Sequence, residues 1–276
     1  MEPMVLVNDN LEYFTIPSWT KLNPNLSVGF STRDGGISKG NFSSMNLALH
    51  VEDKNQVVIA NRQILCSVIN FSFDAWTCAE QVHCNNIEII SEDSRGKGRY
   101  SQLDALPKTD GLITNIADIL LTSYYADCVP LYFYDPVKSI IGLAHAGWKG
   151  TMLKIAQKMV DKFITLYNSN INDIRVVIGP AIGKCCYEVD AMVIEPLRLS
   201  MGTLSKDVVT DKGNGKFDLS LKGLNFLILE EAGVISKNIQ ISSLCTSCNT
   251  KLFYSHRKEN GKTGRMVSWI AFRKGE

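Results

Sequence analysis

Three residues of metal-ligand type each stand at the end of a strand-like apolar stretch. His83 ends AWTCAEQVH, Cys128 lies in YADCVP between two apolar runs, and His145 ends IGLAH before the glycines of AGWKG. Side chains at the ends of different strands can converge on one point. Two imidazoles and one thiolate suit Zn²⁺, with the fourth position open to water. Such an open site is a catalytic one, because zinc can lower the pKa of bound water to about 7.

These three candidate ligands are separated by 45 and 17 residues along the chain. Such spacings match no short local metal motif. A lone histidine is also more often a structural group than a ligand. The residues alone therefore leave open whether His83, Cys128 and His145 bind a metal or have structural roles.

Two cations beside glycine turns are candidates for binding phosphate. Lys149 lies in AGWKGT, where Gly147 and Gly150 let the backbone turn into a helix whose free N–H groups favour an anion. A lysine at a helix start opposes the helix dipole, so it needs a reason, although a solvent-facing lysine is the plain alternative. Arg33, in STRDGG, can clamp phosphate through two parallel hydrogen bonds, or pair with Asp34 as a turn arginine.

Four further cysteines lie in two short motifs. CTSC (245–248) is one CxxC without a second pair and without a thioredoxin-like context, so it is a weak metal signal. IGPAIGKCC (178–186) is rich in glycine after a strand, but it is not the P-loop pattern. We interpret Cys185 and Cys186 as core and turn residues, and the CTSC pair as structural cysteines.

Strands dominate the elements that must position these residues. The candidates are rich in β-branched and aromatic residues: LSVGFST, AWTCAEQVH, DGLITN, ILLTSYY, VPLYFYD, SIIGLAHAG, IRVVIGP and RMVSWIAF. Two loop-rich stretches, 91–102 and 205–216, are expected to be surface excursions. We find no repeat and no long linker, which favours a single domain over 1–276.

Helices are fewer. An apolar face repeats with a 3.6-residue period over 151–167, and Thr151 can cap its start. A second helix is expected at about 219–232, capped by Asp218 and stopped at Gly233, and a third around 54–69. Runs of strands broken by a few helices predict an α+β fold with mixed β-sheets flanked by helices.

The composition excludes several classes of protein. Of the 276 residues 45% are apolar and 21% charged, and the net charge of +1 gives no field that attracts nucleic acid or anionic membrane. The start MEPMVLVNDN lacks the basic and apolar regions of a secretory signal, and no apolar run reaches the roughly 18 residues of a membrane span. We expect a cytoplasmic protein with reduced cysteines and no nucleic-acid or membrane partner.

Seven motifs taken together resemble those of the YfiH family, also called the multicopper polyphenol oxidase or laccase-domain family. In chain order they are FSTRDGGIS, EQVH, DGLIT, ADCVPLYFYDP, GLAHAGWKGT, IGPAIGKCCYEV and YSHRKENGKTGR. The resemblance covers nearly the whole chain, and it implies a YfiH-like fold. It also implies that the histidine of QVH, the cysteine of ADC and the histidine of HAGW, here His83, Cys128 and His145, bind zinc. His256, in the SHR motif, is implied to line the cavity without binding the metal.

The same resemblance implies an activity. The leading hypothesis is a zinc-dependent purine nucleoside phosphorylase, acting on adenosine, inosine, guanosine and methylthioadenosine, with adenosine deaminase activity. Its partners would be a purine nucleoside and phosphate, and the protein a monomer or weak homo-oligomer. Phosphorolysis needs a cationic cradle, for which Arg33 and Lys149 are the candidates. The catalytic residues would be His83, Cys128 and His145.

Three alternatives remain open. One is hydrolysis of an amide in a peptidoglycan precursor, with Cys128 as zinc ligand or as nucleophile and His145 as its base. Another is a metal- or nucleoside-binding protein without turnover. A copper-dependent polyphenol oxidase is less favoured, because four histidines are too few for type-1 and trinuclear copper centres in one subunit, although one His₂Cys copper site is conceivable.

The chain departs from the family pattern at two positions. Cys84 follows His83 where glycine is common, which adds a thiol beside a ligand in a tight turn. Tyr125 precedes Ala126 where threonine is common, which places a bulky ring close to Cys128. Either change is expected to reshape the pocket.

Overall fold

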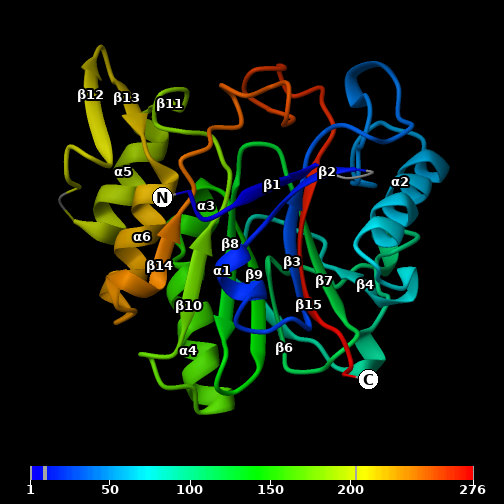
Figure 1. Ribbon diagram of the computed structural model, residues 1–276. Helices are drawn as coiled ribbons and strands as arrows, with labels where there is room; N and C mark the ends of the chain where they lie inside the picture. The colour runs from blue at the N-terminus through cyan, green and yellow to red at the C-terminus, as the bar shows by residue number, and fades with distance from the viewer. Residues whose placement is uncertain (1, 9–10, 203, 276) are drawn as a thin grey trace.

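The computed structural model describes residues 2–8, 11–202 and 204–275 and has four layers, two β-sheets between two layers of helices (Figure 1). The first sheet has the strand order β1 (Val5–Asn8), β2 (Glu12–Thr15), β3 (Leu26–Ser31), β15 (Met266–Phe272), β7 (Leu120–Tyr125) and β4 (Trp76–Cys78). The second has the order β14 (Ile239–Ile241), β10 (Arg175–Ile178), β8 (Val129–Asp135), β9 (Ile140–Ala146), β6 (Gly111–Thr114) and β5 (Ile87–Ile89).

A third, small sheet stands beside the second. Its strands are β11 (Glu188–Asp190), β13 (Lys216–Leu219) and β12 (Val209–Gly213). The helices are α1 (Pro17–Thr20), α2 (Asn55–Val68), α3 (Trp148–Met152), α4 (Ile155–Tyr167), α5 (Ala191–Met201) and α6 (Leu221–Glu231). Both large sheets mix parallel and antiparallel pairs, so the expected α+β fold with mixed sheets is confirmed.

The alternation of side chains along β9 shows how the layers pack. Ile140 and Ala144 face a core shared with α4, α5 and α6, whereas Ile141 and Leu143 face the core between the two large sheets. His145 lies two residues beyond Leu143, so its side chain points to the same face of the sheet and lies at the end of the layer between the two large sheets. The other face of the first sheet packs against α2.

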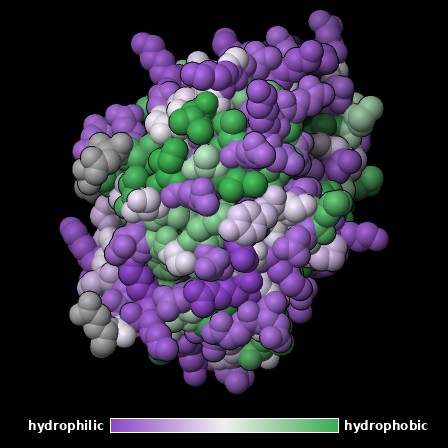
Figure 2. All heavy atoms as spheres, turned by 90° about the vertical axis from the view of Figure 1, so that its right-hand side faces the viewer, coloured by the Kyte–Doolittle hydropathy of each residue, from purple (hydrophilic) through white to green (hydrophobic). Residues whose placement is uncertain are grey.

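The surface beyond α2 is mixed. Figure 2 shows this side of the molecule, where hydrophilic side chains surround smaller islands of hydrophobic ones. Among the described residues, no helix combines the length and the apolar character that crossing a membrane requires.

The helix expected over 151–167 is two helices, which corrects the prediction. Lys154 has a left-handed backbone, with φ of 54°, and separates α3 from α4. Gly147 is the N-cap of α3, and Thr151 lies buried inside it, where its hydroxyl accepts a hydrogen bond from Asn225. The apolar period continues through the break, and for that reason the sequence pattern did not reveal it.

Other boundaries also differ from expectation. The cap of α6 is Ser220, whose hydroxyl accepts from the N–H of Gly223, because Asp218 lies within β13. The expected stop is present, since Gly233 has a φ of 94° just beyond the helix. The stretch 205–216, expected to be a loop, holds β12. Helix α5 was not expected, and it contains Pro196, which weakens its sequence signal.

Candidate metal and substrate site

A cavity of about 500 Å³ opens at the end of the inter-sheet layer. All four histidines of the chain line it, namely His50, His83, His145 and His256. Cys128 and two arginines, Arg257 and Arg265, also line it, as do Trp148 and Tyr187. A second depression, of about 580 Å³, has neither histidine nor cysteine in its lining. The histidines therefore gather, with Cys128, in the cavity at the end of the inter-sheet layer.

The three expected ligands come together in this cavity. His145 lies at the end of β9, Cys128 in the turn between β7 and β8, and His83 in the loop after β4. Their ligand atoms all lie within 4.8 Å of one another, and the two imidazole rings have centroids 4.7 Å apart. The set of two imidazoles and one thiol can hold a metal ion.

The backbone beside the ligands is held in uncommon conformations. Gln81, His83 and Asp127 have φ of 57°, 61° and 83°, in the left-handed region that non-glycine residues rarely adopt. The side-chain amide of Gln81 hydrogen-bonds to Tyr124 of β7 as the backbone of a paired strand would. Its oxygen accepts from the N–H of Tyr124 (2.8 Å), and its nitrogen donates to the carbonyl of Tyr124 (2.9 Å). These bonds attach the loop of His83 to the edge of the first sheet.

Asp110, buried at the start of β6, orients both histidine ligands. One carboxylate oxygen contacts Nδ1 of His145 at 2.8 Å and accepts from the N–H of His83 at 3.1 Å. The other accepts from the N–H groups of Val82 (3.0 Å) and Cys84 (2.8 Å). With Nδ1 of His145 bound to a carboxylate, Nε2 is the ring nitrogen left for a metal, which is the usual arrangement around a ligating histidine.

The two histidines have opposite pKa shifts. Desolvation in the cavity, and then the charge of His145, lower the pKa of His83 to about 4, so that its ring is neutral at pH 7. Burial lowers the pKa of His145 as well, but the Cys128 thiolate and the Asp110 carboxylate outweigh it and raise that pKa to about 10. A metal cation bound here would take the place of the proton that these two anions hold.

The neighbouring glycine leaves room for a metal. A Cβ atom added at Gly147 would lie 2.8 Å from Nδ1 of His83 and 3.1 Å from Sγ of Cys128. Both approaches are too close for a side chain to be accommodated without movement. The lack of a side chain at this position keeps the space between the ligands open, and the donor set and its surroundings fit a metal ion.

The turn that carries Cys128 is fixed by hydrogen bonds to the neighbouring residue, Asp127. The carboxylate of Asp127 accepts from the hydroxyls of Thr246 (2.6 Å) and Ser255 (3.0 Å) and from the N–H of Arg257 (2.7 Å). The segment before β15, which supplies His256 and Arg257, is thereby attached to the turn that carries the thiol.

The cationic side of the cavity is formed by Arg257 and Arg265. Their side chains donate to backbone carbonyls, of Glu188 in the first case and of Thr263 and Gly264 in the second. Among the residues that the structure describes, neither forms an ion pair with a carboxylate. Two positive charges therefore remain available to an anionic ligand.

The two cations chosen from the sequence do not line this cavity. The guanidinium of Arg33 donates to Glu259 at 3.0 Å and to the carbonyls of Thr250 and Ser43, and it lies 4.5 Å from the centre of the Tyr254 ring. Its donors are engaged within the protein, so the phosphate clamp expected of it is not supported. Exposed Lys149 lies in the first turn of α3, with Nζ 5.6 Å from the Trp148 ring.

The two departures from the family pattern are accommodated locally. The N–H of Cys84 binds Asp110, and its thiol donates to the carbonyl of Lys108 at 3.3 Å. Tyr125 is buried beneath His145, with ring centroids 5.5 Å apart, and its hydroxyl donates to the carbonyl of Ala144 at 3.3 Å. Tyr125 is not part of the cavity lining, so its ring supports the ligand and does not narrow the pocket.

Sequence reasoning missed several residues of the site. Asp110 and Asp127 lie in the DGLIT and ADC motifs, and a carboxylate beside a ligand motif is the signal that would have found them. His50 lies outside the seven motifs, and Arg265 ends the YSHRKENGKTGR motif without a signal that indicates its role. Only the fold places them at the cavity.

Comparison with known proteins yields consistent relatives. Residues 27–273 match the model of a family described as multi-copper polyphenol oxidoreductase laccase. The chain is 42% identical over 262 residues to purine nucleoside phosphorylase YlmD of Bacillus subtilis (strain 168), covering 94% of each chain. It is 43% identical over 246 residues to purine nucleoside phosphorylase YlmD of Geobacillus stearothermophilus, covering 89% of this chain and 90% of the relative.

Solved structures agree with these similarities. The hypothetical protein YfiH of Bacillus licheniformis superposes with a TM-score of 0.93 at 42% identity, covering 99% of this chain and 100% of the other. YlmD from Geobacillus stearothermophilus gives the same TM-score at 39% identity, with the same coverage.

Proposed function

Because this chain belongs to the multi-copper polyphenol oxidoreductase laccase family, we propose that it is a zinc-dependent purine nucleoside phosphorylase that also deaminates adenosine. The observation that carries the proposal is one cavity with a His₂Cys metal set and two arginines free of carboxylates. The relatives named purine nucleoside phosphorylase support it. We treat residues 1–276 as one catalytic domain acting in the cytoplasm, where its unpaired cysteines stay reduced.

His83, Cys128 and His145 are the proposed zinc ligands. Bound there, zinc would supply a Lewis acid at the wall of the cavity. Zinc is favoured over copper because the four histidines of the chain cannot furnish the type-1 and trinuclear centres of a multicopper oxidase. Asp110 fixes the orientation of His145, and Gly147 keeps the space between the ligands free.

In phosphorolysis, an oxygen of phosphate attacks C1′ of the ribose. The bond from C1′ to the purine nitrogen breaks, its electron pair goes to the base, and a proton then neutralises the base. The products are the free base and ribose 1-phosphate. Arg257 and Arg265 are proposed to hold the phosphate, since their charges face the cavity unpaired. Trp148 and Tyr187, which line the cavity, are proposed to contact the base.

The roles of Lys149 and Arg33 are proposed to differ. Lys149 lies close enough for its charge to lower the pKa of His83, and it is proposed to attract phosphate toward the mouth of the cavity. Arg33 is proposed to be a positioning residue. Its ion pair with Glu259 fixes the segment that leads to Arg265, because Glu259 also accepts from Ser255 and Thr263.

The proposal is tested with inosine and phosphate, by chromatographic measurement of hypoxanthine. Arg257→Met and Arg265→Met should each raise the KM for phosphate about tenfold or more, because a hydrogen bond to a charged group contributes about 1.5–3 kcal/mol. Arg95→Met is the matched control, since Arg95 is exposed and outside the cavity. Unchanged phosphate KM in both cavity variants would contradict the assignment.

Deamination is measured separately, as inosine formed from adenosine and water without phosphate. The same arginine variants should keep this activity, because no phosphate takes part in it. Hydrolysis of a muropeptide precursor, with no phosphorolysis of any purine nucleoside, would favour the peptidoglycan alternative. A strong visible absorption band after copper loading, with oxidation of a phenol, would favour the copper oxidase.

A further inference from the structure

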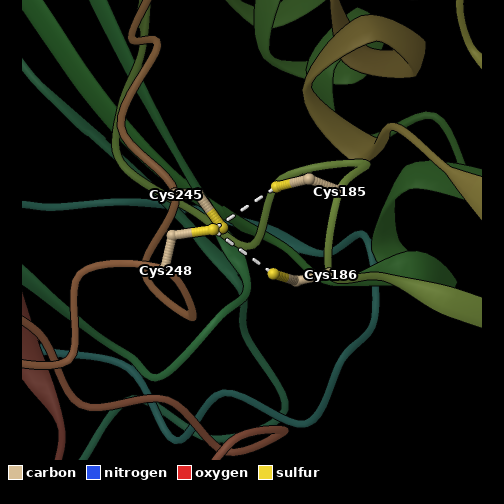
Figure 3. Close-up of side chains that lie close together, drawn as sticks. All are labelled: Cys185, Cys186, Cys245 and Cys248. Atoms are coloured by element: carbon tan, nitrogen blue, oxygen red, sulfur yellow. Dashed lines mark hydrogen bonds between the residues drawn. The ribbon is translucent and has the colours of Figure 1, made fainter.

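Four cysteines outside the catalytic cavity meet at one point. Cys185 and Cys186 lie in the loop from β10 to β11, and Cys245 and Cys248 in the loop that follows β14. Figure 3 shows their sulfur atoms pointing toward one another. Sγ of Cys248 lies 3.6 Å from that of Cys185 and 3.4 Å from that of Cys186, and all four sulfurs lie within 4.8 Å of one another.

The topology of the second sheet explains this meeting. Strands β10 and β14 are parallel neighbours, so both loops leave the same edge of the sheet. The pairing continues beyond the strands, because Ala181 bridges to Cys245 and its carbonyl accepts from the N–H of Thr246 at 3.1 Å. A CxxC motif and a CC pair, 60 residues apart in the sequence, are thereby brought together.

The backbone around the sulfurs suits thiolates. The N–H of Gly183 points at Sγ of Cys245 at 3.1 Å. A Cβ atom at Gly183 would lie 3.0 Å from Sγ of Cys185 and 3.3 Å from Sγ of Cys245, so the glycine leaves space for the two sulfurs to approach. An N–H aimed at a sulfur stabilises negative charge on it.

We propose that Cys185, Cys186, Cys245 and Cys248 bind a structural zinc ion. Tetrahedral zinc with Zn–S bonds of about 2.3 Å requires sulfurs about 3.8 Å apart, and the observed separations lie around this value. Four protein ligands leave no open position, which is the mark of a structural site. On binding, four thiols release four protons, and the complex carries a net charge of −2.

A buried lysine supports the charge of this complex. The side chain of Lys222, in α6, is buried and donates to the carbonyls of Ser242 and Leu244, the second of which directly precedes Cys245. Within the described ranges, Lys222 forms no ion pair with a carboxylate. A buried cation needs a compensating anion, and the zinc-bound thiolates provide one.

The site would stabilise one wall of the catalytic cavity. Between the cysteine pairs and the cavity, Ile182 donates its N–H to the carbonyl of Asp127 at 2.9 Å, and Thr246 donates its hydroxyl to the carboxylate of the same residue. Ile182 and Tyr187 themselves line the cavity. Loss of this zinc should therefore lower the melting temperature and raise substrate KM, although no cysteine of the group touches substrate.

The test counts zinc in a protein whose catalytic ligands have been removed. His83→Ala/His145→Ala, purified under reducing conditions and supplied with zinc, should retain one zinc per chain by elemental analysis. Adding Cys245→Ser/Cys248→Ser should remove it. Adding Cys66→Ala, a buried cysteine in another core, should leave it in place. This count does not depend on nucleoside phosphorolysis, so it can fail or succeed apart from the proposed function.

A second measurement covers the case in which the cysteine variant does not fold. In the wild-type protein, iodoacetamide followed by mass spectrometry should find all four cysteines protected, and zinc chelation should expose them together. Cobalt in place of zinc should give the visible bands of a tetrahedral tetrathiolate. Retention of zinc in the Cys245→Ser/Cys248→Ser background would overturn the proposal. So would a disulfide involving Cys248 in the reduced preparation, or iron in place of zinc.

Discussion

Replacing Asp110 by asparagine removes one negative charge and changes two hydrogen-bond acceptors. The carboxylate accepts four bonds, two on each oxygen, from three backbone N–H groups and from Nδ1 of His145. An asparagine oxygen can keep one pair of these bonds, but its NH₂ group would face the other two donors. At least two of the four bonds are therefore lost, at a carboxylate that is itself fully buried.

Two magnitudes follow. Each buried donor left without a partner costs about 1–3 kcal/mol, so Asp110→Asn should lower the free energy of unfolding by about 2–6 kcal/mol. Removing the carboxylate that orients a ligating histidine typically weakens metal binding 10- to 100-fold, or about 1.4–2.7 kcal/mol. The effect on the fold should therefore equal or exceed the effect on the metal.

Both quantities can be measured on one preparation. Denaturant unfolding of the metal-free protein gives the first, and competition with a chromophoric chelator gives the zinc affinity. Asp93→Asn is the control, because Asp93 is exposed and lies in a surface turn. If Asp110→Asn leaves both the unfolding free energy and the zinc affinity at the wild-type values, the positioning role of Asp110 is wrong.

Three further outcomes are expected. Gly147→Ala should lose its metal and keep its fold, because the new Cβ would lie 2.8 Å from an imidazole nitrogen of His83. Gly150→Ala, whose new Cβ would have no contact shorter than 3.3 Å, should keep its metal, and elemental analysis of both variants checks this. Arg33→Met should lower the melting temperature and raise the phosphate KM less than Arg265→Met does, because the lost ion pair positions the segment of Arg265 and does not contact substrate. A rise in phosphate KM as large as that of Arg265→Met, with an unchanged melting temperature, would favour the direct phosphate clamp. Burial lowers the pKa of Lys222 in the folded protein below its ordinary value of 10.5. Between these two pKa values the unfolded chain binds more protons than the folded one, so the stability of the wild-type protein should rise with pH relative to that of Lys222→Met. Parallel stability curves for the two proteins would contradict this.

Much of the fold could be predicted because its signals are local. The β-branched runs that became β3, β7, β8, β9, β10 and β15 are continuous and strongly apolar, as expected for strands between two cores. The break at Lys154 and the helix containing Pro196 were missed, since the first leaves the apolar period intact and the second weakens it. Tertiary contacts decided both.

The candidate site shows a similar division. His83, Cys128 and His145 stand at or near strand ends, a signal that many residues share, and their assignment as one metal set rested on the resemblance of QVH, ADC and HAGW to the family motifs. Arg33 shows the limit of a local signal, since a cation beside a glycine turn does not reveal whether its side chain faces a cavity or pairs with a carboxylate such as Glu259.

The two cysteine pairs could not be recognised as one group from the sequence. Each pair alone is a weak signal, and only the parallel pairing of β10 with β14 joins them. Long-range strand order is the information that a local pattern lacks.

The position of β15 has a consequence for the order of events during synthesis. This strand lies between β3 and β7 in the first sheet, yet it is made more than 140 residues after β7. The sheet that holds the loop of His83 therefore has a gap at its centre until residues 266–272 have left the ribosome. Pairing over such a separation is slow, because the loop must close before its contacts form. Metal capture in the cavity should accordingly follow the emergence of β15, as a late event that a chain truncated before this strand cannot perform.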